Sequence, residues 1–348
     1  MRFVCDTGFA AQTRSIMAEA SMLVRVSTIS AGKFRRYRHF RFVDYITTPS
    51  VTLKNIADVA KIIVGFAQSL WIIGLFRPDV VFAKGGFVCL PVGWAARVWR
   101  VPIVIHDSDA RPGLTNRLLA PFARAIATGY PLDNYPYDKQ VSAYTGVPIR
   151  AGCAPVSNER QRDAKRAYDI APSTRLIVGV GGGLGARSIN RALVESAAVL
   201  PKQSVKIIIV AGMKHYNETL ELAAGSDQIE VLEFVAEGMV ELLSAADIVV
   251  TRSSATSLQE LAGLAKPIIA VPARQLGDQH KNAAVYGAAE AAIVLGDDAL
   301  ERGELGGTLK ELLTNSDKQA ALAHNLHQFA RPHAARDVAR IVIATVKK

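Results

Sequence analysis

The chain has 348 residues, of which 50% are hydrophobic and 21% are charged, with 26 Gly and 15 Pro. This composition excludes disordered, collagen-like and low-complexity proteins, and the length predicts two domains. The formal net charge of +10 lies entirely in residues 1–150, which hold 19 basic and 9 acidic side chains, whereas residues 151–348 hold 22 of each. Such asymmetry predicts two units with different tasks, one of which faces an anionic partner.

Short apolar, β-branched runs alternate with segments of helical period along the chain. Strands are predicted at Val80–Ala83, Ile103–His106, Leu176–Val180, Lys206–Val210, Asp247–Thr251 and Pro267–Val271. Helices are predicted at Pro91–Trp99, Leu114–Phe122, Ser188–Leu200, Met239–Ser244 and Ser257–Ala265. This alternation predicts an α/β fold class with parallel sheets covered by helices, arranged as two successive doubly wound domains joined near residues 147–152.

Two segments of the first half indicate which anionic partner its positive charge binds. Lys33–Phe42 interleaves basic and aromatic side chains, which suits nucleic acid and an anionic lipid surface equally. Ile62–Phe76 is the most membrane-like segment, but its 15 residues are fewer than the roughly 20 that span a bilayer. We therefore expect a soluble or peripheral protein and favour a membrane surface over nucleic acid. A buried helix is the alternative for Ile62–Phe76.

Two polar motifs follow predicted strands of the first half. The loop Ala83-Lys-Gly-Gly-Phe87 leads into a helix, and the strand ending at Ile105 continues into His106-Asp-Ser-Asp-Ala-Arg-Pro-Gly113. A His beside two carboxylates at a strand end is a candidate acid–base cluster. The alternative is a polar turn that caps the helix Leu114–Phe122. The spacing fits no standard metal site, and we expect no metal.

A glycine-rich loop, Gly181-Gly-Gly-Leu-Gly185-Ala-Arg-Ser-Ile-Asn190, follows a strand of the second half. Glycines allow close approach to a phosphate, and the N–H groups of the following helix point at it. The loop also matches a relaxed dinucleotide fingerprint, but the next strand ends in Ala211-Gly-Met-Lys214 without the carboxylate that binds a nicotinamide ribose. The loop therefore favours phosphate binding over NAD binding, and a tight turn without a ligand is the remaining alternative.

Two further polar loops follow strands of the same half. Thr251–Glu260 supplies Arg252 to neutralise a diphosphate and Glu260 to accept hydrogen bonds from ribose hydroxyls, unless it is only a capped surface helix. Gly277-Asp-Gln-His-Lys-Asn282-Ala283 opens an alanine-rich helix. Because ligands bind beyond the carboxyl ends of parallel strands, we expect the three loops to converge on one nucleotide-diphosphate site.

These motifs, in this order, resemble the MurG family of glycosyltransferases, family 28. The matching motifs are Gly85-Gly-Phe87, His106-Asp-Ser-Asp with Gly113 and Asn116, Gly146-Val-Pro-Ile-Arg150, Gly181–Asn190, Glu233-Phe-Val235, Arg252 to Glu260, and Asp278-Gln with Asn282-Ala283. The resemblance implies a GT-B fold, two Rossmann-like domains that face across a cleft. It also implies inverting transfer of N-acetylglucosamine from its UDP conjugate to the 4-hydroxyl of a lipid-linked N-acetylmuramyl-pentapeptide during peptidoglycan synthesis, with no cofactor.

The resemblance also implies roles for individual residues. The implied donor-binding residues are Asp109, Asn116, Arg150, Gly182, Gly183, Asn190, Val235, Arg252, Ala255, Ser257, Glu260 and Gln279. The implied acceptor-binding residues are Gly85, Gly86 and Phe87, and the candidate catalytic bases are His106 and Asp107. Within these sets, Val235 would contact the uracil, Glu260 the ribose, and Asp109 and Gln279 the sugar.

The sequence departs from the family pattern at several points. The family opens with a strand and a glycine-rich loop ending in His, whereas Phe3–Gly8 resembles the family's second strand. We expect either that the true start lies upstream of Met1 or that the first domain lacks that strand and His. In addition, Gly183 replaces a Ser, Leu184 a Gln, Asp107 a Glu and Asp109 an Asn.

The expected organisation follows from these motifs. Residues 1–150 form the acceptor domain, which faces the membrane and is incomplete at its N-terminus; residues 151–331 form the UDP-sugar domain; and residues 332–348 form a C-terminal helix. We expect a peripheral protein on the cytoplasmic face of the cell membrane that binds no nucleic acid. The alternatives are a UDP-N-acetylglucosamine 2-epimerase, another UDP-sugar glycolipid transferase, and an inactive scaffold that binds the donor.

Overall fold

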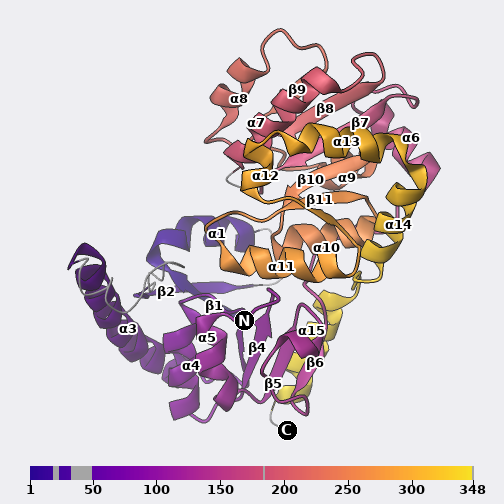
Figure 1. The fold of residues 1–348 in the computed structure, drawn as a ribbon. Coiled ribbons are helices and arrows are strands. Elements are labelled where there is room, and N and C mark those ends of the chain that lie inside the picture. Colours follow the sequence, from indigo (N-terminus) through magenta and orange to yellow (C-terminus); the bar gives the residue numbers. More distant parts are fainter. Residues whose placement is uncertain (19–22, 33–48, 183–184, 347–348) are drawn as a thin grey trace. The chain divides into compact units, whose positions relative to one another are not determined.

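A computed structural model describes residues 1–18, 23–32, 49–182 and 185–346 (Figure 1). The chain divides into two compact units. The first consists of Met1–Ser108, Pro112–Thr145 and Arg336–Lys348, and the second of Asp109–Arg111 and Gly146–Ala335. The basic segment Lys33–Phe42, Gly183 and Leu184 lie outside the described residues.

The first unit contains two parallel sheets. One pairs β1 (Arg2–Asp6) with β2 (Arg25–Ile29), and the other has the order β3-β4-β5-β6. The strands of the second sheet are β3 (Val81–Ala83), β4 (Ile103–Asp107), β5 (Ala125–Thr128) and β6 (Ser142–Tyr144). The helices are α1 (Ala10–Ala18), α3 (Pro49–Phe76), α4 (Cys89–Val98), α5 (Leu114–Leu119) and α15 (Ala334–Thr345). β4 is buried along its whole length. His106 and Asp107, at its carboxyl end, therefore lie at the edge of the sheet but are still buried.

Helix α3 is longer than the apolar segment from which it was inferred. Its portion Ile56–Phe76 has 21 residues and is, by length and composition only, the one helix in the described part of the chain that qualifies as a candidate membrane span, although a single helix of this kind is weak evidence. The prediction that the segment is too short to span a bilayer is therefore wrong. The length of the apolar segment was underestimated because the count began after Lys61, whereas the helix and its apolar character continue toward the N-terminus.

The second unit is a single six-stranded parallel sheet with the order β12-β11-β10-β7-β8-β9. Its strands are β7 (Arg175–Val180), β8 (Val205–Val210), β9 (Ile229–Leu232), β10 (Ile248–Arg252), β11 (Ile268–Val271) and β12 (Ile293–Val294). Its helices are α6 (Asn158–Arg166), α7 (Arg187–Ser196), α8 (Tyr216–Leu222), α9 (Met239–Ala245), α10 (Ala255–Leu264), α11 (Gly277–Ala288), α12 (Asp297–Glu301), α13 (Glu304–Thr314) and α14 (Ser316–His327).

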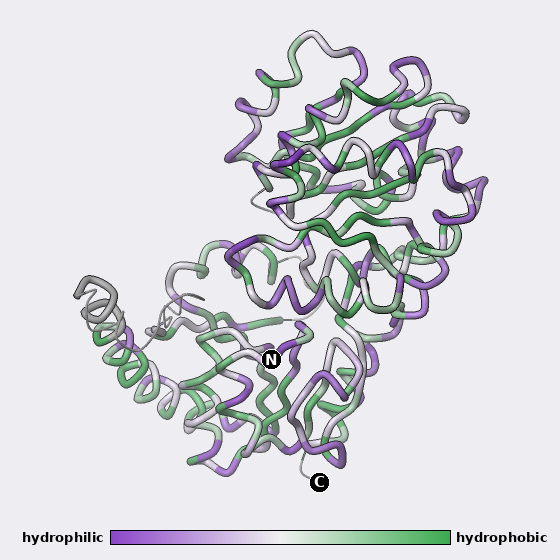
Figure 2. The backbone as a smooth tube through the Cα atoms, viewed as in Figure 1, coloured by the Kyte–Doolittle hydropathy of each residue, from purple (hydrophilic) through white to green (hydrophobic). Residues whose placement is uncertain are grey.

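Helices cover the second sheet. α7 packs against α8, α12 and α13, and α10 packs against α9 and α14 (Figure 1). The central strands are mostly apolar, as Figure 2 shows by their green colour, because a parallel sheet covered by helices buries its side chains on both sides. The leucines of α13 join Ile189 and Leu193 of α7 in one core with these strands.

The predicted strands are present within one residue at each end, and the α/β prediction is confirmed. Two predicted helices end earlier than expected: α5 stops at Leu119 and α7 at Ser196, and each continues as a short 3₁₀ turn, Ala120–Phe122 and Ala197–Val199. The sequence analysis did not propose β5, β6, β9 or β12. These strands have two to four residues each, too few to produce a distinct periodic signal.

Candidate functional site

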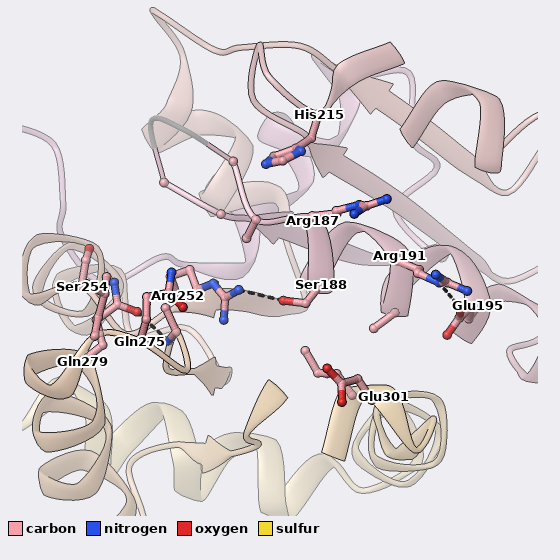
Figure 3. Close-up of a pocket in the computed structure, with 18 residues that line it drawn as sticks. Arg187, Ser188, Arg191, Glu195, His215, Arg252, Ser254, Gln275, Gln279 and Glu301 are labelled. Atoms are coloured by element: carbon pink, nitrogen blue, oxygen red, sulfur yellow. Dashed lines mark hydrogen bonds and ion pairs between the residues drawn. The ribbon is translucent and has the colours of Figure 1, made fainter. Parts of the chain in front are cut away.

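The loops that follow β7, β10 and β11 line one pocket of about 940 Å³ in the second unit. These three strands are neighbours in the sheet and run parallel, so their carboxyl ends meet at one edge. The lining residues include Gly181, Gly182 and Gly185 from the first loop, Arg252 and Ser254 from the second, and Gln275 and Gln279 from the third (Figure 3). The expected convergence of the three loops is confirmed.

The glycine loop has a backbone that side chains would disrupt. Gly182 and Gly185 have φ angles of 82° and 75°, in the left-handed region. A Cβ atom on Gly185 would lie 1.9 Å from the carbonyl oxygen of Ala211. Helix α7 begins directly after the loop, and its N-cap residue, Ala186, offers no side-chain acceptor to the first turn. These N–H groups and the positive end of the helix dipole suit a bound phosphate.

Arg252, the last residue of β10, is held by a network at the pocket. Its guanidinium donates to the Asp297 carboxylate at 2.9 Å, to Ser188 Oγ at 2.7 Å and to the Val271 carbonyl oxygen at 3.3 Å. Ser188 Oγ also donates to Asp297 at 2.7 Å, and the second oxygen of Asp297 accepts from the backbone N–H of Arg274 at 3.0 Å. Arg252 is thus fixed by groups from α7, α12 and β11, and Figure 3 marks its bond to Ser188 of α7.

Every arginine that lines this pocket is paired with a carboxylate. Arg187 pairs with Glu218 at 2.6 Å, Arg191 with Glu195 at 2.9 Å, and Arg252 with Asp297 at 2.9 Å. The pocket therefore carries little excess positive charge, in keeping with the neutral composition of this half. The pocket therefore offers an anion backbone amides and guanidinium groups whose charges are already paired.

Helix α10 carries the carboxylate of Glu260, which is not among the residues that line the pocket. Ser254 caps the helix by accepting from the backbone N–H of Ser257, and Ala255 is the first helical residue. Glu260, two turns further on, lies 3.7 Å from the guanidinium of Arg150. Burial raises the pKa of Glu260, and the nearby Arg150 opposes that shift. Val235 lies half-buried in the loop after β9 and does not line the pocket.

A second set of contacts surrounds Asn282 of α11, a buried residue. Its amide nitrogen donates to the Asp109 carboxylate at 2.9 Å and to the Ser253 carbonyl oxygen at 3.0 Å, and its oxygen accepts from the backbone N–H of Ala110 at 2.8 Å. Burial raises the pKa of Asp109, while the bond from Asn282 lowers it. Gln279 lies one turn earlier, lines the pocket and accepts from the backbone N–H of Ala273 at 2.9 Å.

Asn190, implied as a donor ligand, is buried on α7. Its amide nitrogen donates to the Ala211 carbonyl oxygen at 3.1 Å and to Thr219 Oγ1 at 3.0 Å. The side chain thus ties α7 to the region after β8, and it is not among the residues that line the pocket.

The first unit brings the other implied site residues together around the end of β4. Asn116 donates to the carbonyl oxygen of His106 at 3.0 Å, and His106 Nδ1 lies 3.2 Å from Ser108 Oγ. Gly85 has a φ of 91°, and a Cβ there would lie 2.8 Å from the Asn116 amide nitrogen. The loop therefore approaches Asn116 closely at Gly85, because Gly85 has no side chain, whereas Gly86 is exposed with open space beside it.

The two candidate bases are buried, His106 at 0% and Asp107 at 5% exposure. Asp107 accepts from Tyr137 at 2.5 Å and from the backbone N–H of Gly113 at 3.3 Å. Burial is the main cause that raises the pKa of Tyr137, and the Asp107 charge adds to it, so the phenol is a permanent donor near neutral pH.

The sequence analysis missed Ser188, Asp297, Asn282 and Tyr137 as functional candidates. Ser188 and Asn282 lie inside motifs that were recognised, and their polarity beside a strand end was the available signal. Asp297 and Tyr137 lie far along the chain from their partners, and no local pattern marks them. Among the described residues, no group of three or more His, Cys, Asp and Glu could hold a metal ion.

Comparison with known proteins agrees with this geometry. Residues 24–128 match the N-terminal domain model of glycosyltransferase family 28, and residues 176–338 match its C-terminal domain model. Two relatives named UDP-N-acetylglucosamine–N-acetylmuramyl-(pentapeptide) pyrophosphoryl-undecaprenol N-acetylglucosamine transferase are each 33% identical. The protein from Flavobacterium psychrophilum matches 85% of this chain and 80% of its own length, and that from Shouchella clausii matches 83% and 77%.

Solved structures establish the GT-B fold. MurG of Acinetobacter baumannii superposes with a TM-score of 0.69 at 22% identity, covering 99% of this chain and 98% of its own. A UDP-N-acetylglucosamine 2-epimerase from Neisseria meningitidis superposes with a TM-score of 0.62 at 11% identity, covering 99% and 98%. The two Rossmann-like units, the ordered motifs and the matches over most of the chain lead to one conclusion: this chain belongs to glycosyltransferase family 28.

Proposed function

We propose that this chain transfers N-acetylglucosamine from UDP-N-acetylglucosamine to the 4-hydroxyl of a lipid-linked N-acetylmuramyl-pentapeptide in peptidoglycan synthesis. The carrying observation is the pocket at β7, β10 and β11, which combines a glycine loop, an uncapped helix N-terminus and a fixed arginine. The relatives that share about a third of its residues bear the name of this activity, whereas the epimerase is alike only in fold.

In this proposal the second unit binds the donor. The backbone amides of Gly182 and the first turn of α7 receive the diphosphate together with Arg252. Gly183, which lies outside the described residues, would extend this loop. Glu260 accepts hydrogen bonds from the ribose hydroxyls, and Val235 contacts the uracil through its backbone.

The remaining implied donor ligands complete this binding site. Gln279 and Asp109 contact the sugar, and Ala255 and Ser257 present the start of α10. Arg150 orients Glu260 across their 3.7 Å contact. Asn116 and Asn190 act by holding backbone in place, since their amide nitrogens already donate to protein carbonyl oxygens.

The proposed chemistry is a direct displacement with inversion. The 4-hydroxyl oxygen of the acceptor forms a bond to the anomeric carbon as the bond from that carbon to the diphosphate oxygen breaks, and UDP leaves with the electron pair. The hydroxyl proton passes to His106 or Asp107 as the base. Loop amides and Arg252 offset the negative charge that grows on the leaving diphosphate. Gly85, Gly86 and Phe87 receive the acceptor.

We further propose that the first unit associates peripherally with the cytoplasmic face of the cell membrane. Helix α3 packs one side against the rest of the unit: Ile62, Ser69 and Ile73 are buried, and the exposed Gln68 accepts from the backbone N–H of Ser30 at 2.7 Å. Other large apolar side chains of the helix are exposed, Trp71 at 71% and Leu75 at 66%, and Figure 2 shows the hydrophobic character along the helix. Such an apolar face suits contact with lipid.

A hollow of about 820 Å³ in the same unit adds positive charge. It is lined by Arg97, Arg100 and Arg124 together with apolar residues of α15 such as Ile341. No salt bridge joins any of these three arginines to a carboxylate in the described part of the chain. Unpaired arginines beside apolar surface favour an anionic lipid headgroup region.

The test is incubation with radiolabelled UDP-N-acetylglucosamine and a lipid-linked muramyl-pentapeptide in detergent micelles. We expect a labelled lipid-linked disaccharide and release of UDP, and substitution of Arg252 by Ala should reduce both together. A sample that converts the donor to its 2-epimer without acceptor would instead support the epimerase. Binding of UDP with neither product, in the chain extended by any upstream coding residues, would contradict enzymatic activity and support a scaffold.

A further inference from the structure

We propose that Asp297 sets how tightly the pocket retains the diphosphate, by neutralising Arg252 while holding its guanidinium in place. Asp297 is thus a positioning residue with an electrostatic effect, and none of the family motifs described above contains it. The inference rests on the proposed function, because it assumes that UDP is bound at this pocket.

The Arg252–Asp297 pair lies inside the protein rather than on its surface. The side chains are 14% and 10% exposed, and the N···O distance is 2.9 Å. Both oxygens of Asp297 are used, one by Arg252 and Ser188 and the other by the backbone N–H of Arg274. The bonds from Ser188, Arg274 and Arg252 lower the pKa of Asp297 despite its burial, so the carboxylate is charged at neutral pH.

A carboxylate at this position repels a bound dianion. Arg252 lines the pocket together with the glycine loop, so the charge of Asp297 acts on whatever the loop holds. Because a half-buried charge is poorly screened, one negative charge within about 10 Å of a diphosphate opposes its binding by roughly tenfold or more. The enzyme must release UDP after each turnover, and weaker retention of the diphosphate favours that release.

Removing the charge need not release Arg252. In Asp297→Asn the amide oxygen still accepts from the guanidinium, and Ser188 Oγ and the Val271 carbonyl oxygen retain their bonds to Arg252. The only contact that Asn cannot reproduce in the same orientation is acceptance from the Arg274 backbone N–H. A purely structural role therefore predicts weaker UDP binding in this variant, whereas a charge-neutralising role predicts tighter binding.

The chain offers two matched controls. Asp298 is the next residue, is 75% exposed and pairs with Arg274, which also reaches Glu301. It lies on the same helix but, among the described residues, makes no hydrogen bond or ion pair with Arg252, so Asp298→Asn removes the same charge at the surface. Ser188→Ala removes a hydrogen bond from the network without changing its charge.

The experiment is calorimetric titration of the full chain with UDP at 50 mM NaCl, together with product inhibition by UDP in the transferase assay. We expect the Kd and the inhibition constant to fall about tenfold in Asp297→Asn and to stay within about twofold of wild type in Asp298→Asn. Ser188→Ala, which loses a bond to Arg252 but no charge, should not tighten binding. Asp297→Ser is a second neutral variant and should tighten binding in the same direction.

Unchanged or weaker binding in both neutral variants would overturn the inference while leaving the proposed function intact. Equal tightening in Asp298→Asn would also overturn it, because the effect would then be a general one of net charge. If wild-type protein does not bind UDP at all, the proposed function itself fails, and this inference fails with it.

Discussion

The phenol of Tyr137 donates a 2.5 Å hydrogen bond to the carboxylate of Asp107, across 30 residues of sequence and within the first unit. Tyr137 also stacks on Tyr135, with ring centroids 5.6 Å apart and an interplanar angle of 9°. Tyr137, which is stacked on Tyr135, thus holds the Asp107 carboxylate in place at the carboxyl end of β4. The hydroxyl of Tyr137 and the backbone N–H of Gly113 donate to this buried carboxylate, one to each of its oxygens.

Tyr137→Phe is expected to destabilise the protein by about 1–3 kcal/mol, because it leaves a buried carboxylate oxygen without its donor. Urea unfolding at pH 7 measures this change. A double-mutant cycle with Asp107→Asn should show strong coupling, since both substitutions remove the same bond. Additive effects of the two substitutions would contradict a direct interaction.

The same pair predicts a dependence on alkaline pH. The pKa of Tyr137 is raised in the folded state, so its contribution to stability is complete below pH 10, where tyrosine in the unfolded chain is still protonated. Above pH 10 the unfolded chain loses this proton first, and the contribution declines. The stability difference between wild type and Tyr137→Phe should therefore narrow between pH 10 and pH 11.

Arg252→Ala should destabilise the second unit by about 2–4 kcal/mol, because Asp297 then remains buried without its counter-charge. UDP affinity should also fall, since the diphosphate loses its guanidinium. The double variant Arg252→Ala/Asp297→Ala should regain most of the stability but none of the affinity. Thermal unfolding and UDP titration, carried out on the same samples, separate the two effects. A double variant as unstable as the single one would show that the pair is not the cause.

Glu260→Gln should weaken UDP binding by about ten- to a hundredfold, because a charged acceptor for the ribose hydroxyls is lost. The loss should be smaller for 2′-deoxy-UDP, which lacks one of those hydroxyls, so the preference for UDP over its deoxy analogue should shrink. Burial raises the pKa of Glu260. As the pH is lowered, the UDP affinity of the wild type should therefore begin to fall at a higher pH than it would with a glutamate of ordinary pKa. Calorimetry with both nucleotides across pH 4.5–7.5 tests this, and equal losses for the two would argue against a ribose contact.

Lys266 is expected to reduce stability at neutral pH. Burial lowers its pKa to about 8, although Asp247 opposes the shift, and its ammonium donates to the Ala246 carbonyl oxygen at 2.8 Å. Because the folded pKa lies below that of the unfolded chain, wild-type stability should rise with pH from about 8 to about 10.5, by at most about 1.4 kcal/mol per pH unit.

Lys266→Met should remove that rise, which urea unfolding at several pH values would detect. The exposed Lys202→Met serves as the control and should keep it. An identical pH slope in wild type and Lys266→Met would refute the assignment to Lys266.

Trp71→Ser/Leu75→Ser should reduce binding to vesicles that contain phosphatidylglycerol by at least about tenfold, because each exposed apolar side chain contributes about 1.5 kcal/mol or more when it leaves water. Leu220→Ser, an exposed leucine on α8 of the second unit, should bind like wild type. Co-sedimentation at 50 and 500 mM NaCl should show weaker binding at the higher salt, because the arginines act through screened charges. Equal vesicle binding at the two salt concentrations would contradict an electrostatic role for the first unit.

The sequence by itself determined the α/β class, the positions of the longer strands and the three strand-end loops of the second half. These features follow from local composition: β-branched runs, glycines at positions of positive φ and polar residues after strands. The convergence of the loops also followed, because parallel strands place their carboxyl ends at one edge whatever their order in the sheet.

Only the tertiary structure decided which side chains meet. Arg252 and Asp297 are 45 residues apart, and they pair because crossover connections return β12 and α12 to the edge beside β10 and β11. The composition showed that the second half has no net charge. It did not show that each arginine lining the pocket pairs with a carboxylate. Likewise, the apolar run of α3 did not reveal which side chains are buried: polar Ser69 is 1% exposed, whereas Trp71 is 71% exposed. Side-chain pairing depends on packing between distant segments, and that is the information a single sequence lacks.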